Sequence, residues 1–419
     1  MIAVIRDLTF NEFESFANNH ILANRYQTIN YAMLMSECDY DYDLIGYFEN
    51  EKLVAASLII FKNITSFKKY GYAPKGFLVD YLNPHLLERF TKALVEYYQR
   101  LGVVFIKVNP ELVINQIDNK TKEKTEHKNI IARRYLADNG YFKLKDNIYF
   151  ESRLPRFNAF INLKKYDINK IQKHTRNKIR RAEQKGLEFE VVENNGIDTL
   201  YEFIKKKRPK DVIYYKKYYN MYKKTGSVDI FLVSVNYEKY LVNAQENYEQ
   251  ELEINAKMNS TLAHDNSKKN INKKMESDRK LISYKNDVMA ATEGANYNGK
   301  RYIAGAMVVK FANRVDIVMS GYDTSCGEFD ANYFLHNSII EYYKDSYEIL
   351  DMNGITGDFT DKNPYQGLND FKLGFNPKVY ELIGEYDLIL KPMAYRKLYN
   401  KGILAKVLNK EEKELLQFN

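Results

Sequence analysis

Residues 237–290 limit the fold of this chain most, because their pattern suits two long helices and no sheet. The stretch holds nine acidic and nine basic residues and no proline. Its polar sequence HDNSKKN at 264–270 lies between two apolar stripes with helical spacing. The stripes are Leu241, Ala244, Tyr248 and Leu252, then Ile271, Met275, Ile282 and Met289. We therefore predict two antiparallel helices joined by a turn, with a flexible charged insertion as the alternative.

Outside that stretch the chain repeats one pattern on both sides of Pro155, with strand-like runs separated by helix-like runs. Asn83-Pro84 offers an N-cap and a first helical residue, while the Lys-rich stretch 115–130 is typical of a surface loop. Helices between strands, together with short hairpins, predict an α/β (α+β) fold with partly antiparallel sheets. The strand-like runs are 44–48, 52–61, 77–80, 103–110, 157–163, 187–192, 228–235, 301–310, 315–320 and 348–352.

Composition argues against several classes of protein. No run of about 18 apolar residues suits a membrane span, and Arg6 and Asp7 interrupt what would be the apolar core of a signal peptide. Cys38 and Cys326 are the only cysteines, which excludes a disulfide framework and a Cys-based zinc site. The six histidines are scattered without paired-ligand spacing, so we expect no metal. We expect a cytoplasmic protein.

Three short segments carry candidate chemistry. The sequence KHTRNKIRRAEQK at 173–185 has six cations and one acidic residue; a helix of this kind attracts phosphates, or is merely a solvated surface. In FKLGF at 371–375 a lysine stands between aromatic residues, where it would be buried and oriented. The sequence NGITGD at 353–358 has two glycines but lacks the Lys and Ser/Thr of a phosphate-binding loop.

Taken in order, several segments resemble the Fem family of non-ribosomal peptidyltransferases, and most of all its FemA/FemB branch. The resemblance covers nearly the whole chain. It implies two GNAT-like acyltransferase domains, the first at 1–154 plus about 380–400 and the second at 155–379. A helical hairpin arm at 237–290 would be inserted in the second domain, and a helical tail would follow at 401–419. The matching segments are YAPKGFLVDY, VVFIKVNPEL, KHTRNKIRRAEQKGLEFEV, ILDMNGITGDF and DFKLGFNPKVYELIGEYDL.

The resemblance also implies an activity. An amino acid of the Gly, Ala or Ser class would pass from aminoacyl-tRNA to an amine on the stem peptide of a lipid-linked peptidoglycan precursor. No cofactor is implied beyond aminoacyl-tRNA as co-substrate. The family's catalytic pair corresponds to Phe371 and Lys372, with the lysine stabilising the oxyanion. The protein would work at the inner face of the plasma membrane, in contact with anionic lipid and with Fem-like homologues or a second copy.

The sequence departs from the family in its first domain. Asn109 stands where relatives that use a nucleotide-linked precursor have an Asp, and Glu111 is nearby. The phosphate-holding residues of those relatives are replaced near Ser36 and Tyr214, which favours a lipid-linked acceptor, with Lys75 taking part of their role. The substrate-binding candidates are Lys75, Asn109, Glu111, Tyr214, Tyr333 and Asn353, and the candidates for tRNA or membrane contact are Arg176, Lys178, Arg180, Arg181 and Lys185.

Two alternatives to the transferase stay open at this point. Because position 109 lacks the Asp, one alternative is a non-catalytic Fem-like scaffold that binds tRNA or membrane. A CoA-dependent acetyltransferase ranks third, because no Gly-rich basic loop precedes a helix to hold a pyrophosphate.

Overall fold

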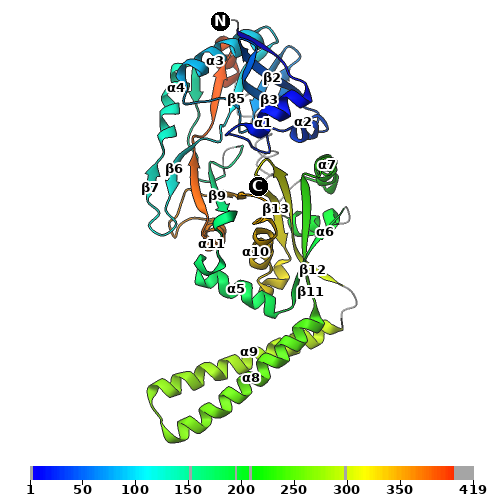
Figure 1. Cartoon of the computed structure of the whole chain (residues 1–419), viewed down its shortest axis with the longest axis vertical. Coiled ribbons are helices and arrows are strands. Elements are labelled where there is room, and N and C mark those ends of the chain that lie inside the picture. Colours follow the sequence, from blue (N-terminus) through cyan, green and yellow to red (C-terminus); the bar gives the residue numbers. More distant parts are fainter. Residues whose placement is uncertain (1–2, 151–152, 194–195, 207–209, 297–299, 401–419) are drawn as a thin grey trace.

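The structure is a computed structural model that describes residues 3–150, 153–193, 196–206, 210–296 and 300–400 (Figure 1). The helical tail predicted at 401–419 lies outside these residues. Two mixed sheets are stacked along the long axis of the molecule, and a pair of helices projects from the lower one. Within the described ranges, no helix is both long enough and apolar enough to cross a bilayer.

The first sheet has seven strands in the order β1-β2-β3-β4-β5-β16-β8. The predicted hairpin of β2 and β3 turns at Asn50 and Glu51, whose positive φ angles of 47° and 66° give the twist that a two-residue turn needs. The predicted N-cap is also confirmed, since Asn83 Oδ1 accepts from Leu86 N at 3.0 Å. The strands are β1 (Ala3–Asp7), β2 (Asp41–Glu49), β3 (Lys52–Thr65), β4 (Lys68–Ala73), β5 (Val103–Val108), β8 (Tyr141–Lys143) and β16 (Tyr386–Ile389).

The helices of this upper part lie against the first sheet. They are α1 (Phe10–Asn19), α2 (Ile29–Ser36), α3 (Pro84–Gln99), α4 (Ala132–Asp138) and α12 (Pro392–Asn400). Helix α3 buries an apolar stripe that includes Leu87, Phe90 and Leu94 against the sheet, as its spacing predicts.

The second sheet has nine strands in the order β10-β11-β12-β13-β14-β9-β15-β6-β7. Its parallel pair, β13 and β14, is joined only between 314–316 and 349–351. Beyond that point the β14–β9 register shifts between Asp351 and Gly354. The strands are β6 (Val113–Ile117), β7 (Lys124–Glu126), β9 (Phe157–Asn162), β10 (Leu187–Val192), β11 (Val228–Val235), β12 (Arg301–Phe311), β13 (Arg314–Tyr322), β14 (Ile349–Ile355) and β15 (Lys378–Leu382).

Four helices cover this second sheet and a fifth reaches the first. Helix α7 packs against α2 of the upper part through a core of tyrosines, so the two sheets are held together by aromatic side chains. Tyr222 OH also donates to the carbonyl of Arg25 at 3.4 Å across this junction. The helices are α5 (Lys173–Gln184), α6 (Gly196–Ile204), α7 (Val212–Lys223), α10 (Ala331–Tyr343) and α11 (Gln366–Gly374).

Two local predictions are wrong, and one helix is absent from the predicted elements. Residues 77–80 form no strand: Leu78 makes one bridge to Ala56, and the apolar run is buried as an irregular core segment. The predicted loop at 115–130 contains most of the hairpin β6–β7, because its polar residues suit the edge of a sheet. Helix α7 was not among the predicted elements, because its tyrosines do not stand out as an apolar stripe.

Strand pairing does not follow the predicted domain division everywhere. Strands β6 and β7, from the 1–154 segment, belong to the second sheet. In the 380–400 segment β16 joins the first sheet, whereas β15, which ends at Leu382, joins the second. The division therefore stays a prediction about folding units, and the chain crosses between the sheets several times.

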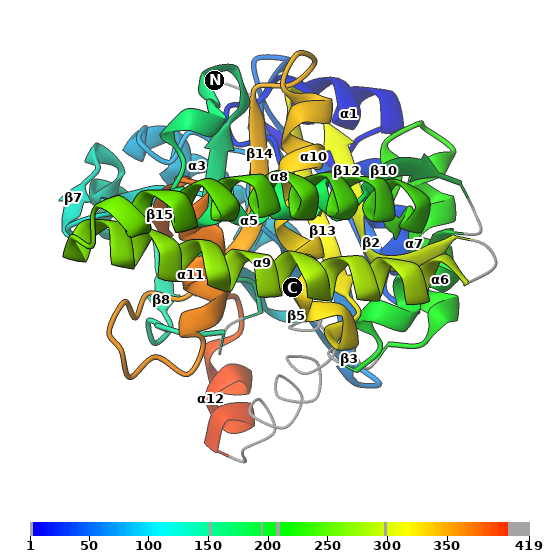
Figure 2. The ribbon, with the colours of Figure 1, turned by 90° about the horizontal axis from the view of Figure 1, so that it is seen from below.

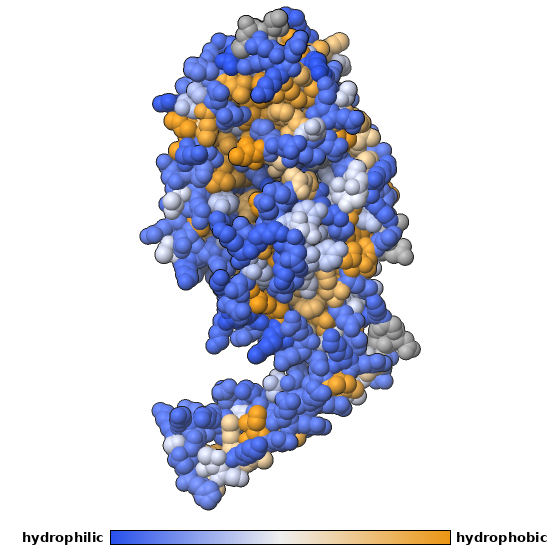
Figure 3. Space-filling model, in the orientation of Figure 1, coloured by the Kyte–Doolittle hydropathy of each residue, from blue (hydrophilic) through white to orange (hydrophobic). Residues whose placement is uncertain are grey.

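The predicted arm is confirmed as helices α8 (Tyr237–His264) and α9 (Lys268–Ala295), which form an antiparallel pair (Figures 1 and 2). The predicted facing stripe on α9 is wrong. Ile271, Met275, Ile282 and Met289 are all exposed, and apolar surface is visible on the arm in Figure 3. The seam lies beside that stripe, where Asn255 Nδ2 donates to Ser277 Oγ at 3.0 Å. The two helices therefore pair through a partly polar face of α9, which lies next to its most apolar face.

Candidate active site

Lys372 is buried on the short helix α11, which packs against β14 in the middle of the second sheet. Its Nζ donates to the carbonyl oxygen of Gly354 on β14 at 2.5 Å. The register shift in β14 brings this carbonyl out of the regular ladder. A buried cation is able to respond to negative charge that develops nearby, because the local dielectric is low.

Phe371 lies beside Lys372 and lines a pocket of about 380 Å³. Its ring makes edge contacts with Tyr333, at 4.9 Å between ring centres, and with His336, at 4.8 Å. Lys178 of the basic helix α5 reaches the same pocket, with Nζ 4.5 Å from the centre of the Tyr333 ring and 3.1 Å from Asp330 Oδ1. Predicted residues from three distant segments therefore share one pocket.

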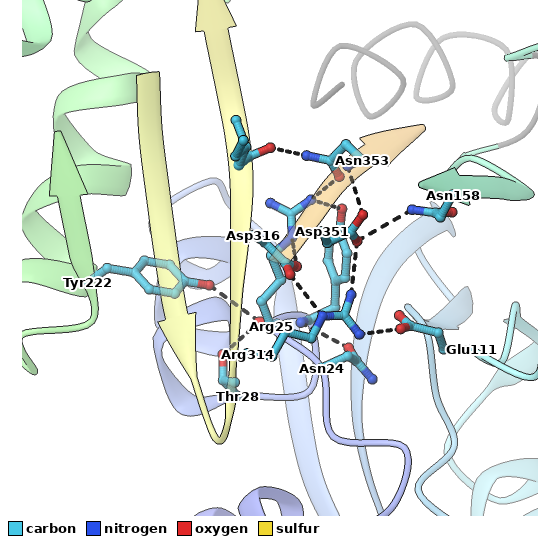
Figure 4. Close-up of polar contacts among 12 residues, drawn as sticks. Asn24, Arg25, Thr28, Glu111, Asn158, Tyr222, Arg314, Asp316, Asp351 and Asn353 are labelled. Atoms are coloured by element: carbon cyan, nitrogen blue, oxygen red, sulfur yellow. Dashed lines mark hydrogen bonds and ion pairs between the residues drawn. The ribbon is translucent and has the colours of Figure 1, made fainter. Parts of the chain in front are cut away.

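A cluster of buried charges lies where the two sheets meet (Figure 4). Arg314 on β13 donates to Asp316 and Asp351, both at 2.9 Å, and to Glu111 from the segment that follows β5. Arg25, from the loop between α1 and α2, lies with Nε 3.1 Å from Asp316 Oδ2. Burial alone would lower the pKa of Arg314, but the three carboxylates raise it, so the guanidinium stays charged.

Lys75 and Asn353 border this cluster. Arg25 Nη2 donates to Asn353 Oδ1 at 3.3 Å. Burial lowers the pKa of Lys75, while Glu111 and Asp351 oppose that shift. Burial also favours the neutral form of Glu111, yet Arg314 and Lys75 hold its pKa below the usual value. Glu111 is therefore a carboxylate fixed by cations, which makes it a poor proton acceptor.

Asn109 serves the protein's own backbone. Its Oδ1 accepts from Lys75 N at 2.9 Å and from Tyr72 OH at 3.2 Å. The side-chain oxygen thus fixes the turn that presents Lys75. The oxygen of either an amide or a carboxylate would accept these two bonds at position 109. The presence of Asn109 therefore does not by itself argue against catalysis.

The two lysines are linked through one short path across β14. Lys75 Nζ lies 3.5 Å from the carbonyl oxygen of Pro155. The Pro155 ring in turn packs over Gly354, where an added Cβ would come within 2.5 Å of its Cγ. Gly354 then accepts from Lys372. Glycine is required here because any side chain would push Pro155, and with it the Lys75 segment, away from Lys372.

The remaining candidates are placed less centrally. Tyr214 is buried in the aromatic packing between α2 and α7 and contacts Tyr215 and Tyr218. On α5, Arg176 donates to the Asn169 carbonyl and Lys185 lies 3.1 Å from Asp287 of the arm. Arg180 and Arg181 are exposed, and Arg181 lies 3.8 Å from Asp330. The structure thus supplies one exposed cation, Arg181, beside a residue that lines the Phe371 pocket.

Sequence reasoning missed Arg25, Arg314, Asp316, Asp351 and His336. The signal available for three of them was charge inside otherwise apolar strands, in RVDIVMS and ILDMNGI. Such residues are rarely buried unless they are paired. Arg25 gave no such signal, since it lies in a loop whose partner is almost 300 residues away in sequence.

The buried imidazole of His336 should make the free energy of unfolding depend on pH. Burial lowers its pKa to about 4, and Nδ1 contacts the Asn332 carbonyl at 2.9 Å. The unfolded chain therefore binds a proton between about pH 6.5 and 4 that the folded chain does not, so stability falls as the pH falls. We expect His336→Gln to remove about 2–3 kcal/mol of this pH-dependent loss, measured as the difference in urea-unfolding free energy between pH 7 and about pH 4. Equal pH slopes for both proteins would contradict the assignment.

The chain is similar to known proteins along most of its length. The sequence profile of the FemAB family matches residues 8–400. Aminoacyltransferase FemB of Staphylococcus epidermidis is 22% identical over 423 residues, covering 97% of this chain and 99% of that protein. Lipid II:glycine glycyltransferase of Staphylococcus saprophyticus is 22% identical over 420 residues, covering 94% and 95%.

Among solved structures, the crystal structure of FemX superposes with a TM-score of 0.74 at 18% identity. The match covers 94% of this chain and 99% of FemX. It confirms the fold class predicted from the family resemblance.

Proposed function

Because the chain belongs to the FemAB family, we propose that it is an aminoacyltransferase that extends the stem peptide of a lipid-linked peptidoglycan precursor. Relatives that align along their full length are named aminoacyltransferase and lipid II:glycine glycyltransferase. The observation that carries the proposal is Lys372, a buried cation beside the pocket that Phe371 lines. The amino acid transferred is of the Gly, Ala or Ser class.

The proposed reaction is aminolysis of an ester. The precursor amine attacks the aminoacyl carbonyl, a C–N bond forms, the C–O bond to the tRNA ribose breaks, and the amine proton leaves with the ribose oxygen. Such a step is downhill, so the protein contributes mainly positioning and stabilisation of the oxyanion. Lys372 takes the second role, since its buried Nζ offers a positive charge to an oxyanion that forms nearby. Phe371 excludes water from that side.

The proposed donor is aminoacyl-tRNA, held in part by α5. Arg180 and Arg181 are exposed on this basic helix, and Arg181 lies beside Asp330 of the Phe371 pocket. Changing both to Gln should weaken tRNA binding and lower the slope of log K against log salt by about 1–2, because each phosphate contact releases about one counterion. Filter binding over a salt series measures this slope. Lys257→Gln/Lys273→Gln on the arm is the matched control, and an unchanged slope in the α5 variant contradicts the role.

The proposed acceptor amine approaches from the side of Lys75. This lysine, with Asn109 and Glu111, lies at the ends of β4 and β5 and faces the junction of the sheets. The path of contacts through Pro155 and Gly354 connects this proposed acceptor side with Lys372. A membrane-bound precursor brings the enzyme to the inner face of the plasma membrane.

One assay tests the whole proposal. The protein is incubated in detergent with a lipid-linked precursor and with tRNA charged with Gly, Ala or Ser in turn, and the product is identified by its mass. We expect one of the three to be transferred. If none is transferred while a FemAB relative works under the same conditions, the chain is a tRNA- or membrane-binding scaffold instead.

A further inference from the structure

Three segments that are far apart in the sequence form one exposed surface at the end of the first sheet remote from the candidate active site. They are the β3–β4 turn (62–69), the end of α3 with the turn that follows it (99–102), and 391–400 with helix α12. Lys69 N donates to the Gly102 carbonyl at 3.3 Å, and Gln99 Nε2 donates to the Leu390 carbonyl at 2.8 Å. Figure 2 shows α12 on the side of the molecule where β3 and β5 lie. We call these three segments the distal surface.

Several large apolar side chains on the distal surface are exposed. Phe67 at the tip of the β3–β4 turn and Met393 on α12 are each 89% exposed, and Tyr399 is 69% exposed. Leu101 adds a fourth exposed apolar side chain, and the next residue, Gly102, lies against the Phe67 carbonyl. Scattered exposed apolar residues are ordinary, but several large ones on adjoining turns indicate a contact surface.

The same segments carry an unusual charge. They contain seven basic residues and no acidic one, in a chain whose total excess is +8. Two carboxylates of the flanking strands are turned inward, where Asp43 accepts from Tyr98 OH and Asp387 accepts from Tyr395 OH. The basic residues are Lys62, Lys68, Lys69, Arg100, Lys391, Arg396 and Lys397.

Aromatic and apolar tips surrounded by lysine and arginine match one partner in particular. An anionic bilayer attracts the cations electrostatically, while Phe, Met and Tyr side chains insert at the boundary of headgroups and acyl chains. A nucleic acid would account for the cations but leave Phe67 and Met393 unused. We therefore propose that the distal surface docks the protein on anionic phospholipid. The choice of a membrane rests on the proposed function, since a lipid-linked acceptor must be met at a bilayer.

The position of the distal surface fits this role. The six residues of β4, and likewise those of β5, separate it from the Lys75 end of the sheet, a span of about 20 Å. The distance from a bilayer at the distal surface to the site is thus comparable to the length of a sugar that carries a short peptide. The basic helix α5, on the far side of the second sheet, is left free for the donor.

Two double variants test the proposal by sedimentation with vesicles that contain no substrate. Phe67→Ser/Met393→Ser removes the apolar tips, and Arg396→Gln/Lys397→Gln removes two charges. Both sets are exposed, so the variants should melt as the parent does. We expect the parent to bind phosphatidylcholine vesicles only when phosphatidylglycerol is present, and each variant to bind roughly tenfold more weakly. The matched controls are Ile21→Ser/Val242→Ser and Lys257→Gln/Lys273→Gln, exposed elsewhere and expected to bind as the parent.

Three outcomes overturn the proposal. Equal vesicle binding by parent and variants removes the surface from membrane contact. A loss of tRNA binding without a loss of vesicle binding assigns it to nucleic acid, and a change in oligomeric state assigns it to a second copy. Transfer to a detergent-dispersed precursor is scored separately: a parent that transfers but does not bind vesicles refutes only the docking surface, and variants should transfer normally in detergent.

Discussion

Replacing Lys372 with methionine is expected to lower kcat roughly 10²- to 10³-fold, the loss typical when one oxyanion-stabilising group is removed. Methionine keeps the length and most of the volume of the side chain, so α11 should keep its packing. The charge that would meet the tetrahedral intermediate is lost, together with the hydrogen bond to the Gly354 carbonyl. KM should change little, because the lost interaction forms mainly in the transition state.

Lys310→Met is the matched control for this experiment. Lys310 lies on β12 of the same sheet, with Nζ 2.8 Å from Asp229, so its replacement also removes a lysine contact. We expect kcat to stay within about threefold of the parent for a residue that does not touch the reacting atoms. Single-turnover rates with charged tRNA measure both variants. Near-normal turnover by Lys372→Met would remove this lysine from the mechanism.

Much of the fold follows from local patterns in the sequence. The Asn83 cap, the Asn50-Glu51 turn and the two arm helices depend on residues a few positions apart, and all three are present. Phe371 and Lys372 were identified through the family resemblance, and Lys178 and Tyr333 share the Phe371 pocket. These features need no knowledge of which strands become neighbours.

The features that were missed depend on long-range pairing. The pairing of Arg25 with Asp316 is set only when the two sheets meet, so no spacing in the sequence reveals it. The predicted pairing face of the arm is wrong for another reason. The most apolar stripe of α9 predicts the seam, but the hydrogen bond of Asn255 to Ser277 lies on a neighbouring face. The chain contains 36 tyrosines, and part of this high content is explained by the tyrosines that pack α7 against α2.

Replacing Arg314 with methionine is expected to destabilise the fold by about 3–5 kcal/mol, the cost of leaving buried partners of an ion pair uncompensated. Glu111, Asp316 and Asp351 would lose their shared cation, and only Arg25 would remain within the cluster for Asp316. Arg89→Met is the matched control, because Arg89 makes a similar two-bond contact with Glu49 at the surface. A surface pair of this kind should cost about 1 kcal/mol or less.

The pH dependence of this loss separates lost charge from lost packing. Burial already raises the pKa of Asp316, and removing Arg314 should raise it further. A carboxyl whose folded pKa lies above its unfolded value loses stability as the pH rises through the folded value. The penalty of Arg314→Met, measured by urea unfolding, should therefore be smaller at about pH 5 than at about pH 8. A penalty equal at both would mean that Arg314 acts through packing alone. Because Glu111 comes from the segment after β5 and the aspartates come from β13 and β14, the charge-dependent result would show that buried ion pairing fixes the two sheets around the candidate site.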